Sequence, residues 1–181
     1  MRLDKLYKRN TNPNLYLDEQ DNQNCGSFAL NVDGWYCPYI EDDDDTDGSL
    51  WQYTDCERNS MVTEMIDMGR SREYIMEVLI ERDWEFIMKT CPWLIPIKEE
   101  EIDGKDRVIA YRLSMDFSSG VEDFDMEEDA DFHFRVMIDG EWWEKNGGGP
   151  VHAVEDFDNW TVEKWLVYDG PIKYAKFRVE V

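Results

Sequence analysis

The sequence predicts an α+β fold in which N-terminal helices pack on a C-terminal antiparallel sheet. In the first half, apolar residues recur at helical spacing, for example Met61, Met65 and Met68. From residue 107 onwards, short runs rich in aromatic and β-branched residues are typical of strands. Asp139 and Gly140 lie between two of these runs, as in a two-residue turn that joins antiparallel strands. Helices and strands gathered in separate halves of a chain indicate the α+β class.

The length of 181 residues favours one domain that spans 1–181. We expect a polar N-terminal segment over 1–24, a mainly helical half over 25–96 and an antiparallel sheet half over 107–181. The hydrophobic content of 42% is sufficient for a core, so the composition excludes a chain that is disordered throughout.

Two helical regions are predicted in the first half. A short helix covers 25–32 and stops at Asp-Gly 33–34, and a loop follows over 33–58. The second region covers 59–90, in two pieces that Gly69 separates, with Ser71 capping the second piece. Pro92 cannot continue the helix. The expected buried stripe of the second piece consists of Tyr74, Ile75, Val78, Leu79, Trp84, Phe86 and Ile87.

Strands are expected over 107–115, 132–138, 141–145, 150–154 and 172–181. In the second of these, Phe132, Phe134, Val136 and Ile138 alternate along one face. His133 therefore shares the other face with Asp131, Arg135 and Met137. We expect His133 to point toward an open face of the sheet.

The net charge of −23 comes from 42 Asp and Glu residues against 19 Lys and Arg residues. Such a surface repels nucleic-acid phosphates and anionic membranes, so we expect neither direct nucleic-acid binding nor membrane binding. No apolar run approaches the length of a membrane span, and the N-terminus lacks the apolar stretch of a secretory signal. The expected location is the cytoplasm. A basic partner or substrate would suit this charge.

Cys25 begins the first predicted helix, which is one arrangement that activates a thiol. The attacking species is the thiolate, so the pKa must fall below its free value of about 8.5. Unpaired N–H groups at a helix start lower this pKa. Gly26 would leave room for a substrate backbone, and Gln20 or Asn24 could help to hold an oxyanion. The alternative is that Cys25 is a buried cysteine without a chemical role, because free cysteines are often buried.

Two stretches resemble known families. "NCGSFALN" at 24–31 resembles the nucleophile helix of papain-like cysteine hydrolases, which has Cys-Gly-Ser at its start. "DFHFRVMIDGEWWEKNGGGPV" at 131–151 resembles the histidine hairpin of a group of phage and bacterial proteins that carry an early Asn-Cys motif. The order, cysteine on an early helix and histidine on a later strand, is also papain-like. The resemblance implies a papain-like fold, with Cys25 as nucleophile and His133 as its general base.

The same resemblance implies a third polar residue that holds the histidine, shortly after it on the sheet. Asn146, Glu155 and Asp156 are candidates, and we favour Glu155 or Asp156 because they follow the strand at 150–154. Gln20 is the nearest match to the papain-like glutamine of the oxyanion hole.

Metal and cofactor motifs are weak in this sequence. Asp43, Asp45 and Asp47 match the first half of a calcium loop, but Thr54 stands where the loop needs a bidentate glutamate. Two histidines and four dispersed cysteines give no zinc spacing, and no phosphate-binding loop is present. We expect neither a metal nor a cofactor.

Two functions of different classes follow. The first is a cysteine hydrolase or acyltransferase that acts on a peptide, isopeptide or side-chain amide of a protein or peptide substrate. The second is an acidic, phage-type binding protein that inhibits a host defence or nucleic-acid-binding protein, on an active or an inactive papain-like fold.

Overall fold

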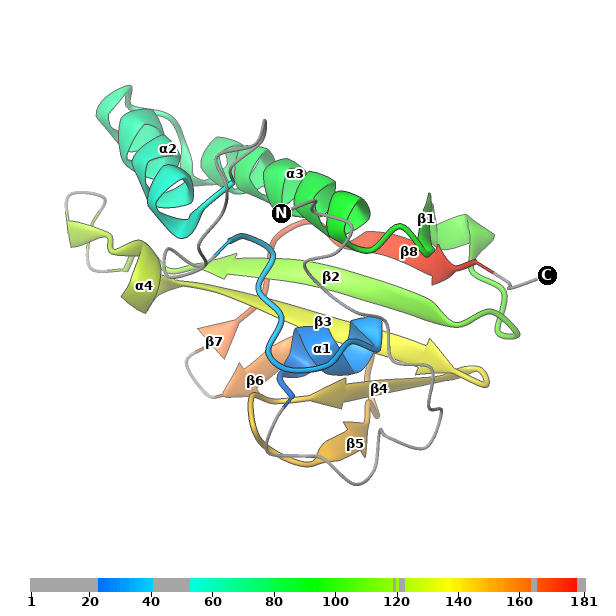
Figure 1. Ribbon diagram of the computed structural model, residues 1–181. Coiled ribbons are helices and arrows are strands. Elements are labelled where there is room, and N and C mark those ends of the chain that lie inside the picture. Colours follow the sequence, from blue (N-terminus) through cyan, green and yellow to red (C-terminus); the bar gives the residue numbers. More distant parts are fainter. Residues whose placement is uncertain (1–22, 41–52, 119, 121–122, 164–165, 179–181) are drawn as a thin grey trace.

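The computed structural model describes residues 23–40, 53–118, 120, 123–163 and 166–178. Gln20 and the calcium-loop candidates Asp43, Asp45 and Asp47 lie outside the described residues. The predicted α+β class is confirmed by helices packed on a six-stranded antiparallel sheet (Figure 1). Among the helices of the described ranges, none combines the length and the hydropathy needed to cross a membrane.

The sheet has the strand order β1-β8-β2-β3-β4-β5, and every neighbouring pair is antiparallel. The strands are β1 (Leu94–Ile97), β2 (Val108–Met115), β3 (Ala130–Ile138), β4 (Glu141–Lys145), β5 (Val151–Ala153) and β8 (Lys173–Phe177). A separate pair consists of β6 (Thr161–Glu163) and β7 (Leu166–Val167). The sequence did not predict β1, β6 or β7, which are four residues long or shorter.

The predicted turn between β3 and β4 is confirmed. Asp139 and Gly140 have φ values of 53° and 82°, as a two-residue hairpin turn requires. This turn sets the register in which Ile138 lies opposite Glu141 and Arg135 lies opposite Glu144.

The helices are α1 (Cys25–Leu30), α2 (Asp55–Asp67), α3 (Arg72–Thr90) and α4 (Met126–Asp129), with a 3₁₀ turn at Glu99–Glu101. Helix α2 begins at Asp55 rather than at residue 59, because Thr54 and Glu57 form a capping box. Helix α4 lies between the predicted strands at 107–115 and 132–138, where the sequence predicted no helix. Tyr74 of α3 is exposed rather than buried, so the predicted stripe is wrong at that position.

The two faces of the sheet are covered differently. Helix α1 packs against β3 and β4, and α3 packs against β2 on the same face (Figure 1). The main core lies there and includes Tyr111, Phe134 and Val136. A smaller apolar cluster that includes Met137, Trp160 and Tyr168 covers the opposite face.

A buried polar group ties the helices to the sheet. Arg58 of α2 donates from Nε and Nη2 to the two carboxylate oxygens of Asp83 on α3, each at 3.1 Å. The hydroxyls of Tyr53 and Tyr111 donate to the same carboxylate at 2.7 and 2.6 Å. We call Arg58, Asp83, Tyr53 and Tyr111 the tyrosine network. Because Asp83 is 0% exposed, it needs these donors to remain buried.

Candidate functional site

Cys25 is the first residue of α1, and Asn24 before it is the N-cap of the helix. Asn24 Oδ1 accepts a hydrogen bond from the Ser27 amide at 2.9 Å, and the Ser27 hydroxyl accepts from the Asn24 amide at 2.8 Å. The Asn24 side chain also bonds the backbone of Tyr36, at 2.8 Å through Nδ2 and 3.2 Å through Oδ1. These bonds anchor the Asn24 side chain to the fold, and its oxyanion role stays a prediction.

The sulfur of Cys25 lies against β3. Within β3, residues 135–138 pair with β4, and the residues before them do not. Helix α1 packs beside β3. The Sγ–H group faces the carbonyl oxygen of Phe132 at 3.9 Å, one residue before His133. Cys25 is 6% exposed. The fold thus brings residue 25 next to the histidine strand, across more than 100 residues of sequence.

The expectation of a lowered thiol pKa is wrong for this structure. Burial raises the pKa of Cys25 to about 12, and the charge of Asp131 acts in the same direction. The amides of Phe134, Gly26 and Cys25 act the other way but are outweighed. At rest, Cys25 is therefore a neutral thiol.

Gly26 was expected to leave room for a substrate backbone, but the structure gives it a role in packing. A Cβ at this position would lie 2.9 Å from Cδ1 of Tyr36 and 3.3 Å from Cε2 of Phe134. The glycine allows α1 to approach the core closely, and it does not open space for a substrate.

His133 is 2% exposed, so the prediction that it faces an open side of the sheet is wrong. Its alternation along β3 is as predicted, but the second apolar cluster covers that face. The His133 ring lies 5.2 Å from the ring of Tyr168 and 6.1 Å, edge-on, from Trp160. The Tyr168 hydroxyl in turn donates to Asp131 at 2.6 Å.

Glu144 of β4 gathers three basic side chains. Its Oε2 lies 3.1 Å from His133 Nε2 and 2.6 Å from Arg135 Nε, and its Oε1 lies 3.0 Å from His152 Nε2. We call these four residues the Glu144 cluster. Burial by itself would raise the pKa of Glu144, but the hydrogen bonds and charges of His133 and Arg135 lower it to about 2. Glu144 is therefore ionised at neutral pH.

This carboxylate fixes the tautomer of neutral His133. Because Glu144 is an acceptor only, His133 must carry its proton on Nε2. No hydrogen bond from a described residue reaches Nδ1 of His133. Among the described residues, none therefore donates to the lone pair at Nδ1.

Cys25 and His133 line one cavity of about 420 Å³. No hydrogen bond joins these two described residues, because the sulfur faces Phe132 and Nε2 of the histidine faces Glu144. The remaining lining residues are Asn24, Trp35, Cys37, Asp131, Phe132, Asn146, Gly147 and Tyr168.

The predicted third residues lie elsewhere than expected. Glu155 and Asp156 are exposed, and neither has a hydrogen bond or ion pair to His133. Asn146 lines the cavity, and its buried Oδ1 has no hydrogen-bond partner in the described structure. The sequence analysis missed Glu144. The two-residue turn at 139–140 could have revealed it, because that turn places residue 144 opposite Arg135.

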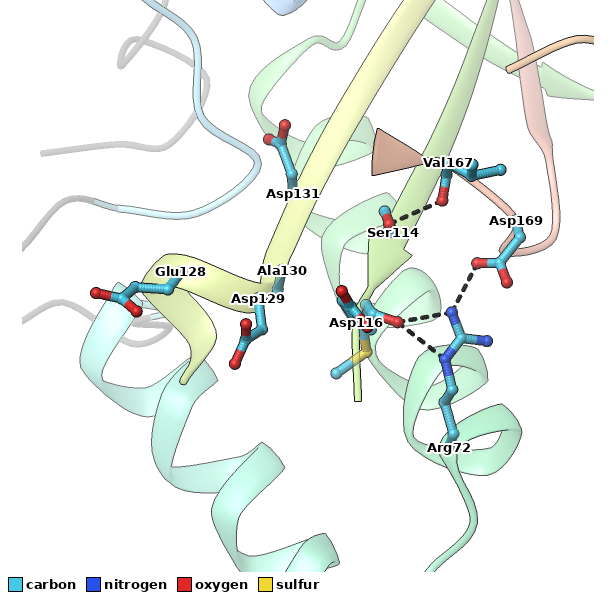
Figure 2. A pocket seen from close by; sticks show the side chains of 10 residues that line it. Arg72, Ser114, Asp116, Glu128, Asp129, Ala130, Asp131, Val167 and Asp169 are labelled. Atoms are coloured by element: carbon cyan, nitrogen blue, oxygen red, sulfur yellow. Dashed lines mark hydrogen bonds and ion pairs between the residues drawn. The ribbon is translucent and has the colours of Figure 1, made fainter. Parts of the chain in front are cut away.

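A second cavity of about 610 Å³ lies between β2, β3, α4 and the segment after β7 (Figure 2). Arg72 donates to Asp169 at 2.8 Å and to the carbonyl of Met115 at 2.7 Å. The other charged side chains of its lining are acidic: Asp116, Glu128, Asp129 and Asp131. Figure 2 shows Glu128 pointing away from Arg72 and Asp131 standing apart, so these carboxylates do not converge on one point.

Among the described residues, no group of three or more His, Cys, Asp or Glu side chains could hold a metal ion. A comparison of the chain with protein-family models, curated proteins and solved structures found no match. The structure thus defines an α+β protein, and its function has to be argued from the cavity of Cys25 and His133.

Proposed function

We propose that the protein is a papain-like cysteine hydrolase or acyltransferase in which Cys25 attacks an amide or ester carbonyl. The observation that carries this proposal is the environment of His133, whose Nε2 bonds a carboxylate and which lines the same cavity as Cys25. A base that a third residue holds in one tautomer is the common arrangement of nucleophilic catalysis.

Glu144 takes the part of the third residue in this proposal. It lies on the strand next to His133 and is ionised, so it stabilises the imidazolium that forms during the reaction. Its side chain is held by Arg135, which also donates to the carbonyls of Phe157 and Asn159 at 2.8 and 2.7 Å.

Because Cys25 is a neutral thiol, it must lose its proton during the attack on the substrate. As the Cys25 sulfur attacks the substrate carbonyl carbon, its proton passes to Nδ1 of His133. The tetrahedral intermediate collapses, His133 returns the proton to the leaving amine or alcohol, and a thioester remains. Water, deprotonated by the same nitrogen, then hydrolyses the thioester and restores the thiol. The sulfur must first leave Phe132, which a rotation of the Cys25 side chain achieves.

An activated aryl acetate tests this proposal without knowledge of the natural substrate. We expect the intact protein to release the phenol and to gain one acetyl group on Cys25, detected by mass spectrometry of its peptides. Cys25→Ala should abolish both signals, and His133→Gln should slow acylation about 100-fold, the usual contribution of a general base.

Cys91→Ser is the matched control for the acylation experiment. Burial raises the pKa of Cys91 to about 12, as for Cys25, but Cys91 does not line the cavity. The control should acylate at the rate of the intact protein. A Cys25→Ala protein that retains this rate would rule out the hydrolase.

The acidic cavity favours a second candidate function, which is the binding of a basic protein such as a host defence or nucleic-acid-binding protein. Four carboxylates of its lining stand beside the pair of Arg72 and Asp169, in a chain of net charge −23. Such binding should weaken steeply as salt is added, and it should survive Cys25→Ala. Binding that is insensitive to salt would exclude this alternative.

A further inference from the structure

Both histidines of the chain contact the same carboxylate. Glu144 Oε2 faces His133 and Oε1 faces His152, and the chain contains no other histidine. His133 is buried, whereas the side chain of His152 is 45% exposed. One buried and one solvent-accessible imidazole therefore share a single anion.

The sheet register produces this arrangement. Glu144 lies directly opposite Arg135 on β3 and directly opposite His152 on β5. His133 lies two residues before Arg135 and so on the same face of β3. Direct and diagonal cross-strand neighbours on one face are within reach of long side chains, so all four groups meet.

We propose that His152 is a positioning residue of the site, which holds Oε1 of Glu144 so that Oε2 stays directed at His133. This inference rests on the proposed function for its catalytic meaning. The contact itself concerns only the described side chains and can be tested separately.

The surroundings of His152 orient its ring. Its Nδ1 lies 3.4 Å from the carbonyl oxygen of Pro150, and its Nε2 faces Glu144. Each ring nitrogen therefore faces a hydrogen-bond acceptor.

Three basic side chains share the two oxygens of Glu144. The titratable or charged groups that contact Glu144 in the described structure are His133 and Arg135 from β3 and His152 from β5. His133 and Arg135 both bond Oε2, whereas His152 bonds Oε1. His152 is therefore the contact that can hold the carboxylate from its other oxygen.

The ring-nitrogen resonances of His133 in NMR spectra test this inference independently of any activity. His152→Gln keeps a side-chain N–H for Glu144, and His152→Ala removes it. In the alanine variant the Nε2–H tautomer of neutral His133 should become less populated, because Oε2 of Glu144 is no longer held toward it. In the glutamine variant the tautomer should be that of the intact protein.

Glu155→Gln is the matched control, because it removes an exposed carboxylate nearby without touching the Glu144 cluster. It should leave the tautomer of His133 unchanged. The inference is overturned if His152→Ala gives the same tautomer population of His133 as this control.

Acylation by the aryl acetate gives the second readout. The kcat should fall about tenfold in His152→Ala but recover in His152→Gln, because orientation is restored. If the NMR change is present but the intact protein is not acylated, the positioning contact stands and the proposed function fails. If the intact protein is acylated but the NMR change is absent, the proposed function stands and the positioning contact fails.

Discussion

Two buried arginine–carboxylate pairs lie on opposite faces of the sheet and differ in their other partners. In the tyrosine network, Asp83 is completed by two phenols, and burial holds the pKa of Tyr53 well above its usual range. In the Glu144 cluster, the remaining partners are two imidazoles, of which His133 lines a cavity. The comparison teaches that two similar buried ion pairs differ in what their other partners offer: a phenol donates a hydrogen bond, whereas an imidazole can also accept a proton.

The largest expected effect is on stability, from breaking the tyrosine network. Asp83→Ala leaves Arg58 buried without its counter-ion, and such changes cost about 3 to 5 kcal/mol in the free energy of unfolding. Urea unfolding followed by circular dichroism measures this loss. Glu77→Ala, an exposed position on the same helix, should stay within about 0.5 kcal/mol. A loss at Asp83 no larger than that of the control would contradict the comparison.

Acid should weaken the Glu144 cluster in a defined pH window. The pKa of Glu144 is lowered in the folded protein from 4.5 to about 2, so the stabilisation is complete above the unfolded value. It is lost as the pH falls from about 4.5 to about 2, and it amounts to at most about 3 kcal/mol.

The measurement is the free energy of unfolding at several pH values for the intact protein and for Glu144→Gln. Other carboxylates titrate in both proteins, so only the difference between the two curves reports on Glu144. That difference should shrink below pH 4.5. Parallel curves would show that His133 and Arg135 do not lower the pKa of Glu144.

Glu144→Gln should also reduce acylation about 100-fold in kcat/KM, because the amide carries no charge to stabilise imidazolium His133. KM should change little. The tyrosine network provides the contrast: Tyr53→Phe removes one hydrogen bond and should leave acylation unchanged while costing about 1 kcal/mol of stability. Equal acylation rates for the Gln variant and the intact protein would remove Glu144 from the mechanism.

The smallest effect on stability is expected at Asn146. Its Oδ1 has no partner in the described structure, so Asn146→Ala should change the free energy of unfolding by less than about 0.5 kcal/mol. A substrate N–H group could satisfy this oxygen, and KM for a peptide substrate should then rise several-fold. A stability loss above about 1 kcal/mol would show that Asn146 serves the fold instead.

Local patterns in the sequence predicted much of the fold. The alternation in β3, the hairpin at 139–140 and the cap at Ser71 depend on neighbouring residues, and each is confirmed. The start of α2 was missed although Thr54 and Glu57 form a recognisable capping box, because the acidic run before them suggested a continuing loop. Strand β1 was missed because two prolines flank and interrupt a four-residue run.

The site depends on contacts that are distant in sequence, so less of it could be predicted. Cys25 and His133 do line one cavity, as the resemblance suggested. The burial of both side chains depends on Trp160, Tyr168 and α1, whose positions no local pattern reveals. The helix start could not lower the thiol pKa because burial outweighs the few N–H groups that reach the sulfur.

Gly26 has a consequence for recognising related chains. Any side chain there would collide with Tyr36 and Phe134, so the close seating of α1 suffices to require glycine after Cys25. A chain without any catalytic activity would still need this glycine to keep its core. In a search for relatives, a Cys-Gly pair would therefore trace the shared architecture, whereas a paired histidine and glutamate on the hairpin would trace the site that we propose to be catalytic.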